Sequence, residues 1–228
     1  MLKRFIDSDV HNLPDWAIVT DDPMRVKMLV AHHLDNVSLI SENRGMLAYT
    51  GTICGVPIGM YSVGFGETST LLYLKEMIDL GVTSVLYLGE CVSHITELHL
   101  NEIVIPQSAC RGSITHYADA GLFEKCLSAA KQGEIPVRKM AIGTEDKYWL
   151  DHKKKGEHYR VTDFASGAVF EYATACGLTA ASILTVSENS LSGQRIGDAQ
   201  RQSRFHSAAK IAIVLMSNMA LQPEGGKL

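Results

Sequence analysis

The 228-residue sequence lacks any apolar run that approaches the roughly 18 residues of a membrane-spanning helix. Residues 1–7 lack the long apolar region of a secretory signal peptide. A basic excess is also missing, because the net charge is −4, which argues against a nucleic-acid partner. We therefore expect a cytoplasmic protein that binds neither nucleic acid nor membranes.

Cysteine is sparse and shows no pairing pattern. The five cysteines are an odd number and none forms a Cys-X-X-Cys pair, which predicts reduced and mostly buried thiols. Zinc-ligand spacing is absent among the nine histidines, although His94, Glu97 and His99 lie close together in the sequence. We interpret these three as a loop cluster, and we expect neither a metal nor a cofactor.

The composition is that of an ordinary globular protein, with 46% hydrophobic and 20% charged residues. Together with the length it predicts one domain spanning residues 1–228. Buried strand patterns alternate along the chain with helical patterns, which predicts an α/β layered fold. The strand patterns lie at 16–20, 58–63, 84–88, 102–105, 137–142 and 180–186, and the main helical patterns lie at 24–33, 118–131, 162–176 and 198–219.

One of these strand patterns ends in a carboxylate. Residues 180–186 are mostly apolar and lead directly into Ser187, Glu188 and Asn189. Ligands of open α/β sheets bind outside the carboxyl ends of the strands. Glu188 is therefore the first candidate for a functional residue, and the alternative is an ordinary glutamate in a surface loop.

Several stretches in colinear order, from about residue 16 to residue 219, resemble the nucleoside phosphorylase family. The likeness is greatest to bacterial hexameric purine nucleoside phosphorylases and to uridine phosphorylases. It implies a single-domain, three-layer α/β/α fold with a mixed, partly barrel-like central sheet. The stretches are Asp22-Pro23-Met24-Arg25, residues 43–52, the glycine turn at 64–70, Leu88-Gly89-Glu90-Cys91, Thr185-Val186-Ser187-Glu188, and the final helical pattern with Arg201.

In this family phosphate attacks the anomeric carbon of a nucleoside while an acid assists departure of the base. The resemblance implies that Glu188 is this acid and that Arg201 positions it. It also implies that Arg25 binds phosphate and that a neighbouring subunit donates Arg44, since arginine forms bidentate bonds to phosphate. The chain is then a homo-oligomer built from dimers, most simply a hexamer.

The resemblance extends to the two sides of the nucleoside. Tyr148 and Trp149 hold the places of aromatic side chains that stack on the base, a contact worth about 1 kcal/mol. On the sugar side, the family's hydroxyl-binding glutamate is replaced by Phe164, which accepts no hydrogen bond. Asp163 can accept one if its side chain turns inward.

The phosphate site departs from the family pattern at three positions. Asp21 replaces a glycine, Tyr87 an arginine and Glu90 a serine. At a separation of 4 Å and an effective dielectric constant near 20, each charge pair is worth roughly 4 kcal/mol before screening. These carboxylates can therefore neutralise the arginines and disfavour a phosphate dianion.

Three functions remain open from the sequence. The first is cleavage of the N-glycosidic bond of a purine or pyrimidine nucleoside by phosphate, the candidate co-substrate. The second is hydrolysis by water, with Asp21 or Glu90 as the general base. The third is a non-catalytic homologue that only binds a ligand.

Overall fold

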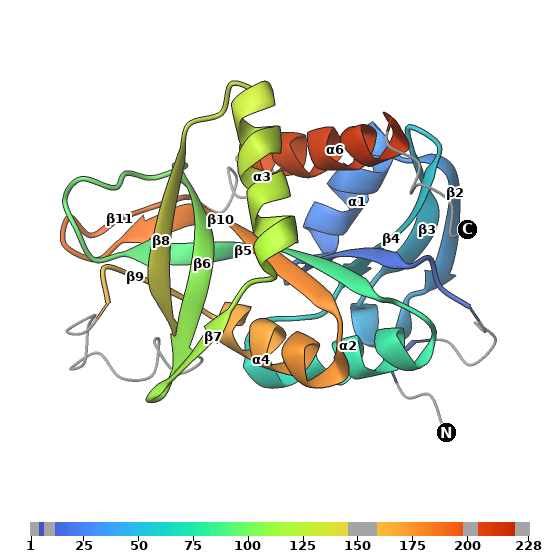
Figure 1. Ribbon diagram of the computed structural model, residues 1–228, viewed down its shortest axis with the longest axis horizontal. Helices are drawn as coiled ribbons and strands as arrows, with labels where there is room; N and C mark the ends of the chain where they lie inside the picture. Colours follow the sequence, from blue (N-terminus) through green and yellow to red (C-terminus); the bar gives the residue numbers. More distant parts are fainter. Residues whose placement is uncertain (1–4, 7–11, 146–158, 198–204, 222–228) are drawn as a thin grey trace.

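The computed structural model describes residues 5–6, 12–145, 159–197 and 205–221. Its centre is an eleven-stranded mixed sheet with the order β11-β10-β6-β8-β9-β5-β1-β4-β3-β2, to which β7 adds by pairing with β6 (Figure 1). The strands are β1 (Trp16–Thr20), β2 (Asp35–Ser41), β3 (Ala48–Ile53), β4 (Val56–Ser62), β5 (Ser84–Ser93), β6 (Ile103–Arg111), β7 (Ile114–Tyr117), β8 (Val137–Thr144), β9 (Val161–Asp163), β10 (Thr179–Asn189) and β11 (Gln194–Arg195).

Part of this sheet closes into a barrel. An additional pairing between β10 and β5 joins the two ends of the path β10-β6-β8-β9-β5, which makes a ring of five strands. The long strand β5 belongs both to the ring and to the open sheet, because it also pairs in parallel with β1. All ten of its residues are buried, as its near-continuous apolar sequence requires.

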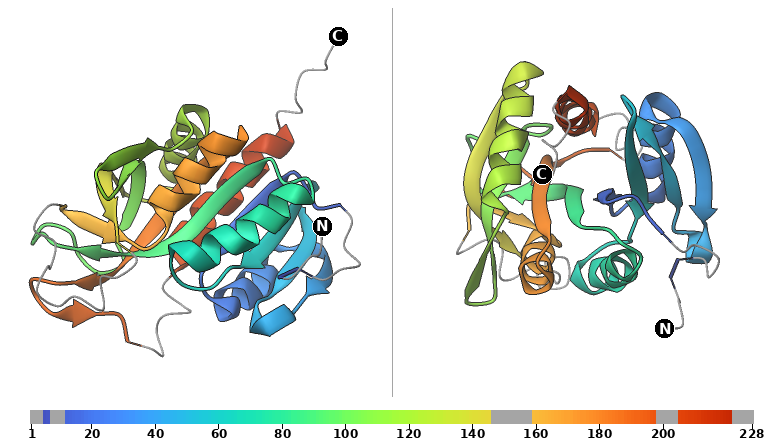
Figure 2. Two further views of the ribbon diagram at one scale, coloured as in Figure 1. Left: turned by 90° about the horizontal axis from the view of Figure 1, so that it is seen from below. Right: turned by 45° about the vertical axis from the view of Figure 1, so that its right-hand side comes forward.

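Helices cover both faces of the sheet, which confirms the predicted three-layer α/β fold. Helices α3 and α6 pack together on one side, whereas α2 and α4 lie side by side on the other (Figure 2). No helix in the described part of the chain has the length and apolarity needed to cross a bilayer. The helices are α1 (Pro23–His33), α2 (Glu67–Asp79), α3 (Ala120–Gln132), α4 (Ser166–Cys176) and α6 (His206–Leu221), with a 3-10 turn η1 (Asn43–Gly45).

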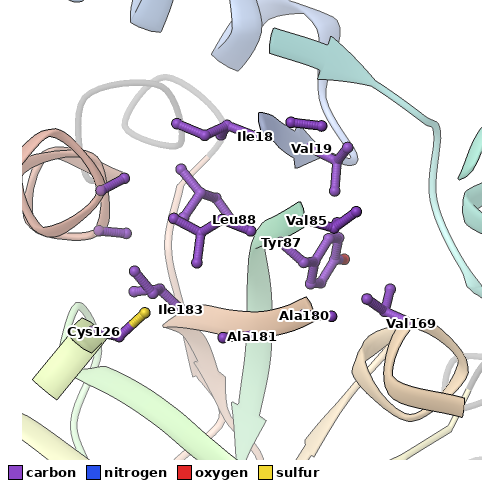
Figure 3. Packing of buried hydrophobic residues seen from close by; sticks show 14 of the residues in the cluster. Ile18, Val19, Val85, Tyr87, Leu88, Cys126, Val169, Ala180, Ala181 and Ile183 are labelled. Carbon is purple, nitrogen blue, oxygen red and sulfur yellow. The ribbon is translucent and has the colours of Figure 1, made fainter. Parts of the chain in front are cut away.

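Strand alternation directs successive side chains of β5 to opposite faces. Figure 3 shows Leu88 on the same side as Ile18 and Ile183, whereas Tyr87 is directed with Val85 toward α4. Glu90, two residues beyond Leu88 in a register without a bulge, shares the face of Leu88. The sheet therefore separates the side chain of Tyr87 from that of Glu90.

Local sequence explains where α1 begins. Asp22 adopts an extended conformation as the N-cap, and its carboxylate accepts a hydrogen bond of 2.8 Å from the backbone N–H of Met24. Pro23 fits the first helical position, since it has no N–H to leave unpaired. This tight connection from β1 places Arg25 in the first turn of the helix, beside the end of the strand.

Three expectations from the sequence need correction. The helix predicted at 162–176 is the short strand β9 followed by α4, because buried Asp163 ends the strand and caps the helix. Strands β2, β7 and β11 escaped prediction, since they are short or mostly exposed and none carries a buried apolar run. The thiols are not mostly buried: Cys91 and Cys126 are, whereas Cys54 and Cys176 are exposed. The first residues of the helix predicted at 198–219 lie outside the described residues.

Candidate active site

The carboxyl ends of β1 and β5 bring one arginine and two carboxylates together. Arg25 donates from Nη1 to Asp21 Oδ1 at 2.6 Å and from Nη2 to Glu90 Oε1 at 2.8 Å. The same Nη1 also donates to the hydroxyl of Thr20 at 2.8 Å and to the carbonyl of Leu88 at 3.4 Å. Sixty-five residues separate Arg25 from Glu90 in the chain, so only the fold assembles this cluster.

The cluster is buried beneath an aromatic ring. The guanidinium carbon of Arg25 lies 3.4 Å from the centroid of the Phe205 ring, and the arginine side chain is only 2% exposed. Phe205 immediately precedes α6, so the start of this helix covers the cationic group. Stacking of a desolvated guanidinium on an aromatic face stabilises the contact by about 2 kcal/mol.

The charges in the cluster do not balance, because two carboxylates share one guanidinium. Burial raises the pKa of Asp21 to about 6, the neighbouring Arg25 opposes this rise, and Glu90 adds to it. Among the described residues, Asp21 Oδ2 and Arg25 Nε have no hydrogen-bond partner. Asp21 therefore combines an unpartnered oxygen with a pKa close to neutrality, which suits a general base.

Tyr87 does not join this cluster directly. Its ring lies on the other face of β5, over the Cα of Gly89, where an added Cβ would meet the tyrosine Cε1 at 2.4 Å. The hydroxyl is fully buried and has no partner among the described residues. Burial raises the pKa of Tyr87 well above its usual value, and the nearby carboxylate of Asp21 raises it further.

Arg44 lies elsewhere on the chain. It is exposed in η1 with a left-handed φ of 60°, and its guanidinium carbon stands 5.4 Å from the ring of Phe5. Burial raises the pKa of Tyr73, a residue of α2, and the charge of Arg44 opposes this rise. The expected neutralisation by Asp21 and Glu90 therefore applies to Arg25, whereas Arg44 stacks against the N-terminal segment of its own chain.

Glu188 sits next to a bulge near the end of β10. The register against β5 shifts between Val186 and Glu188, and after this bulge Glu188 and Asn189 still pair with Val92 and Ser93. Its carboxylate accepts a hydrogen bond of 3.1 Å from Arg195 on β11, an arginine whose side chain is 60% exposed. Arg201, Tyr148 and Trp149 lie outside the described residues, so the expected pairing with Arg201 stays a prediction.

The two residues predicted on the sugar side have different surroundings. Both oxygens of Asp163 are engaged, since Oδ1 accepts from Thr144 at 2.6 Å and Oδ2 from the backbone N–H of Ser166 at 2.8 Å. Burial raises the pKa of Asp163 to about 6 in spite of these hydrogen bonds. Phe164 is buried against the ring of Phe65, with centroids 4.4 Å apart. Asp163 therefore holds α4 and does not turn toward a ligand.

Two neighbours of the cluster were given no role in it from the sequence, although Phe205 belongs to a stretch that carries the family resemblance. Phe205 lies 180 positions beyond Arg25, and no local pattern marks it as the ring that covers a cation. Thr20 looks like an ordinary strand residue, yet its hydroxyl binds the guanidinium. In the parts of the chain that the structure covers, no group of three His, Cys, Asp or Glu side chains is arranged to hold a metal ion.

The comparisons with known proteins agree with this architecture. A family profile described as the phosphorylase superfamily matches residues 15–220. The purine nucleoside phosphorylase DeoD-type of Bacillus velezensis is 26% identical over 93% of this chain and 98% of its own. The protein of the same name from Proteus mirabilis is 28% identical over 93% of this chain and 97% of its own. A match that covers the barrel, the open sheet and the helices on both faces makes this chain a member of the phosphorylase superfamily.

Proposed function

We propose that this chain cleaves the N-glycosidic bond of a purine nucleoside and that water is the acceptor. The choice of a purine rests on the names of the relatives, purine nucleoside phosphorylases. The observation that carries the choice of acceptor is the state of Arg25, which two buried carboxylates already neutralise. A phosphate dianion would have to displace one of them or bind beside two negative charges.

The chemistry follows from the positions of the carboxyl groups. Asp21 takes a proton from water through its unpartnered oxygen, and the water oxygen forms a bond to the anomeric carbon. The bond from that carbon to the base nitrogen breaks, and its electron pair stays with the base. Glu188, in its carboxylic acid form, donates its proton to the departing base and becomes a carboxylate, while Asp21 holds the proton taken from water. The products are the free sugar and the free base.

Phosphorolysis is the second candidate, and the names of the relatives favour it. In that reaction Arg25 leaves Glu90 to bind phosphate, and Arg44 comes from a neighbouring subunit. The transferred sugar then carries a 1-phosphate. Binding without catalysis is the remaining alternative.

Product analysis with and without phosphate separates the three. We expect cleavage of inosine or adenosine to depend only weakly on phosphate and to release free sugar. A strict phosphate requirement with sugar 1-phosphate as the sole product would establish phosphorolysis instead. Absence of any cleavage, by a protein shown to be folded, would favour the non-catalytic homologue.

A variant of Glu90 tests the electrostatic argument directly. Glu90→Ser removes one carboxylate from Arg25, so we expect it to bind phosphate more tightly in calorimetry than the wild type. Glu90→Asp keeps the charge and is the matched control, for which we expect no gain. Equal phosphate binding by all three proteins would show that Arg25 does not face an anion site.

A further inference from the structure

An aromatic pair stands at the edge of the sheet where the proposed reaction takes place. Phe65 follows β4, which pairs with β1, and Phe164 follows β9, which pairs with β5 directly beside Glu90. The two rings lie 4.4 Å apart and are inclined at 42°. Phe164 is buried and also packs on Val92, whereas Phe65 is 49% exposed and covers it. The side chain that a ligand meets here is therefore Phe65.

The polar groups around this pair are already used. Asp163 accepts hydrogen bonds on both carboxylate oxygens, one from the hydroxyl of Thr144 and one from the backbone N–H of Ser166 at the N-terminus of α4. The hydroxyl of Thr162 bonds the ring of His94 at 2.9 Å, and that of Ser69 donates to the carbonyl of Val63 at 2.6 Å. These polar groups are therefore engaged within the protein, and the surface that this wall of the site exposes is the carbon face of Phe65.

The sugar of a bound nucleoside has to lie next to this wall. Its anomeric carbon must lie between Glu188 at the end of β10 and Asp21 at the end of β1, and β5 separates these two strands. The turns that follow β4 and β9 flank that space. This placement rests on the proposed function, because it takes Glu188 as the acid and Asp21 as the base.

We propose that Phe65, backed by Phe164, makes 2′-deoxyribonucleosides the preferred substrates over ribonucleosides. An aromatic face packs well against the C–H groups of a deoxyribose, but it accepts no conventional hydrogen bond from a vicinal diol. A hydroxyl added against an apolar wall lowers specificity by up to about 10²-fold.

The test compares 2′-deoxyinosine with inosine in the full-length protein. We expect the wild type to favour 2′-deoxyinosine in kcat/KM by about 10²-fold. Part of that ratio is intrinsic, since a 2′-hydroxyl withdraws electrons from the anomeric carbon. Comparing variants of half-exposed Phe65 cancels this intrinsic part, because it is the same for every protein. Phe65→Gln supplies a hydrogen-bond acceptor and should reduce the preference in kcat/KM for 2′-deoxyinosine over inosine about tenfold. Phe65→Leu stays apolar and should leave the ratio unchanged.

Binding gives a second readout that does not depend on turnover. Glu188→Gln should bind 2′-deoxyinosine more tightly than inosine, with about a tenfold difference in Kd. Equal Kd values, or identical ratios for Phe65→Gln and Phe65→Leu, would overturn the proposal. If neither nucleoside is cleaved, the proposed function fails, and the two Kd values of the wild type still decide whether the site favours the deoxy sugar.

Discussion

At the scale of single residues, the two buried ion pairs of Arg25 decide how well the protein tolerates substitutions in the candidate active site. Removing one partner of a buried pair commonly destabilises a protein by 3–5 kcal/mol, because an uncompensated charge remains. Here Arg25 keeps a second carboxylate when either Asp21 or Glu90 is replaced. The cluster is therefore more tolerant of single substitutions than an isolated buried pair, which makes the variants proposed here suitable for functional tests.

The first prediction concerns Glu188. Glu188→Gln should lower turnover by about 10²-fold or more if this carboxyl assists departure of the base. Glu188→Asp keeps the carboxyl group and should retain most of the activity. The fold should be unaffected, which circular dichroism can check, and Arg195→Gln controls for loss of the exposed ion pair. Unchanged turnover in Glu188→Gln would rule out the acid role.

The second prediction is a pH dependence of cleavage. Asp21 has a pKa of about 6 and must be ionised to act as a base, so kcat/KM should rise with pH to a plateau above about 6. Arg25, Glu90, Asp22 and the hydroxyl of Thr20 are the groups that act on its charge, and Tyr87 lies beyond them.

The shape of this profile distinguishes the groups. Asp21→Asn should abolish the rising limb, whereas Glu90→Gln should move it to lower pH, because Glu90 raises the pKa of Asp21. A limb that survives in Asp21→Asn would mean that another group is the base.

At the scale of elements, β5 depends on close packing between its own neighbouring residues. The ring of Tyr87 occupies the space over Gly89, so Gly89→Ala should destabilise the protein by about 1–3 kcal/mol through overpacking. Exposed Gly197 has nothing within 4 Å of an added Cβ, so Gly197→Ala should stay within about 0.5 kcal/mol of the wild type. Urea unfolding measures both. Equal stabilities would show that the tyrosine ring moves aside freely.

Asp163, at the junction between β9 and α4, should make the free energy of unfolding depend on pH. The pKa of Asp163 is raised above its ordinary value of 3.8 to about 6, so its contribution is fully present below pH 3.8 and is lost as pH rises through 6. Between pH 4.5 and 7.5 this loss amounts to about 2 kcal/mol.

Asp163→Asn has no carboxyl group to ionise at this position, so its stability should not fall for this reason. Between these pH values the free energy of unfolding of the wild type should therefore fall by about 2 kcal/mol more than that of the variant. Exposed Asp79→Asn serves as the control. Parallel pH profiles for the wild type and Asp163→Asn would contradict the assignment.

The elements differ in how much the sequence reveals about them. The apolar run of β5 and the cap and proline of α1 were readable locally, because each encodes its structure within a few residues. The strand β9 could not be identified in this way, because three residues are too few to show the alternation of apolar and polar side chains that marks a strand. The site behaves likewise: Asp21, Arg25 and Glu90 were identified through a resemblance, whereas the stacking of Phe205 depends on a contact across the fold.

At the scale of the whole molecule, we propose that the chain is at least a dimer and most simply a hexamer. Exposed Arg44 stacks on Phe5 of its own chain, and no contact with the Arg25 cluster is found among the described residues, so we expect Arg44 to act in the active site of another copy. Sedimentation at micromolar concentration should therefore show no monomer. In the phosphate-dependent reaction, mixing Arg44→Ala with Glu188→Gln should restore partial activity, because hybrid assemblies contain one site with both residues intact. A monomeric protein would remove Arg44 from the active site.

The strand β5 belongs to both the ring and the open sheet, and this position affects the order in which the two parts can fold during synthesis. Its partner β1 leaves the ribosome before it, so the open sheet can begin to form early. Its partner β10 emerges about 95 residues later, and until then the ring has no closing strand. Until β10 is synthesised, the edges of β5 and β6 that it will pair with therefore stay unpaired. Unpaired strand edges promote aggregation, so the nascent chain is most at risk of aggregating during this interval.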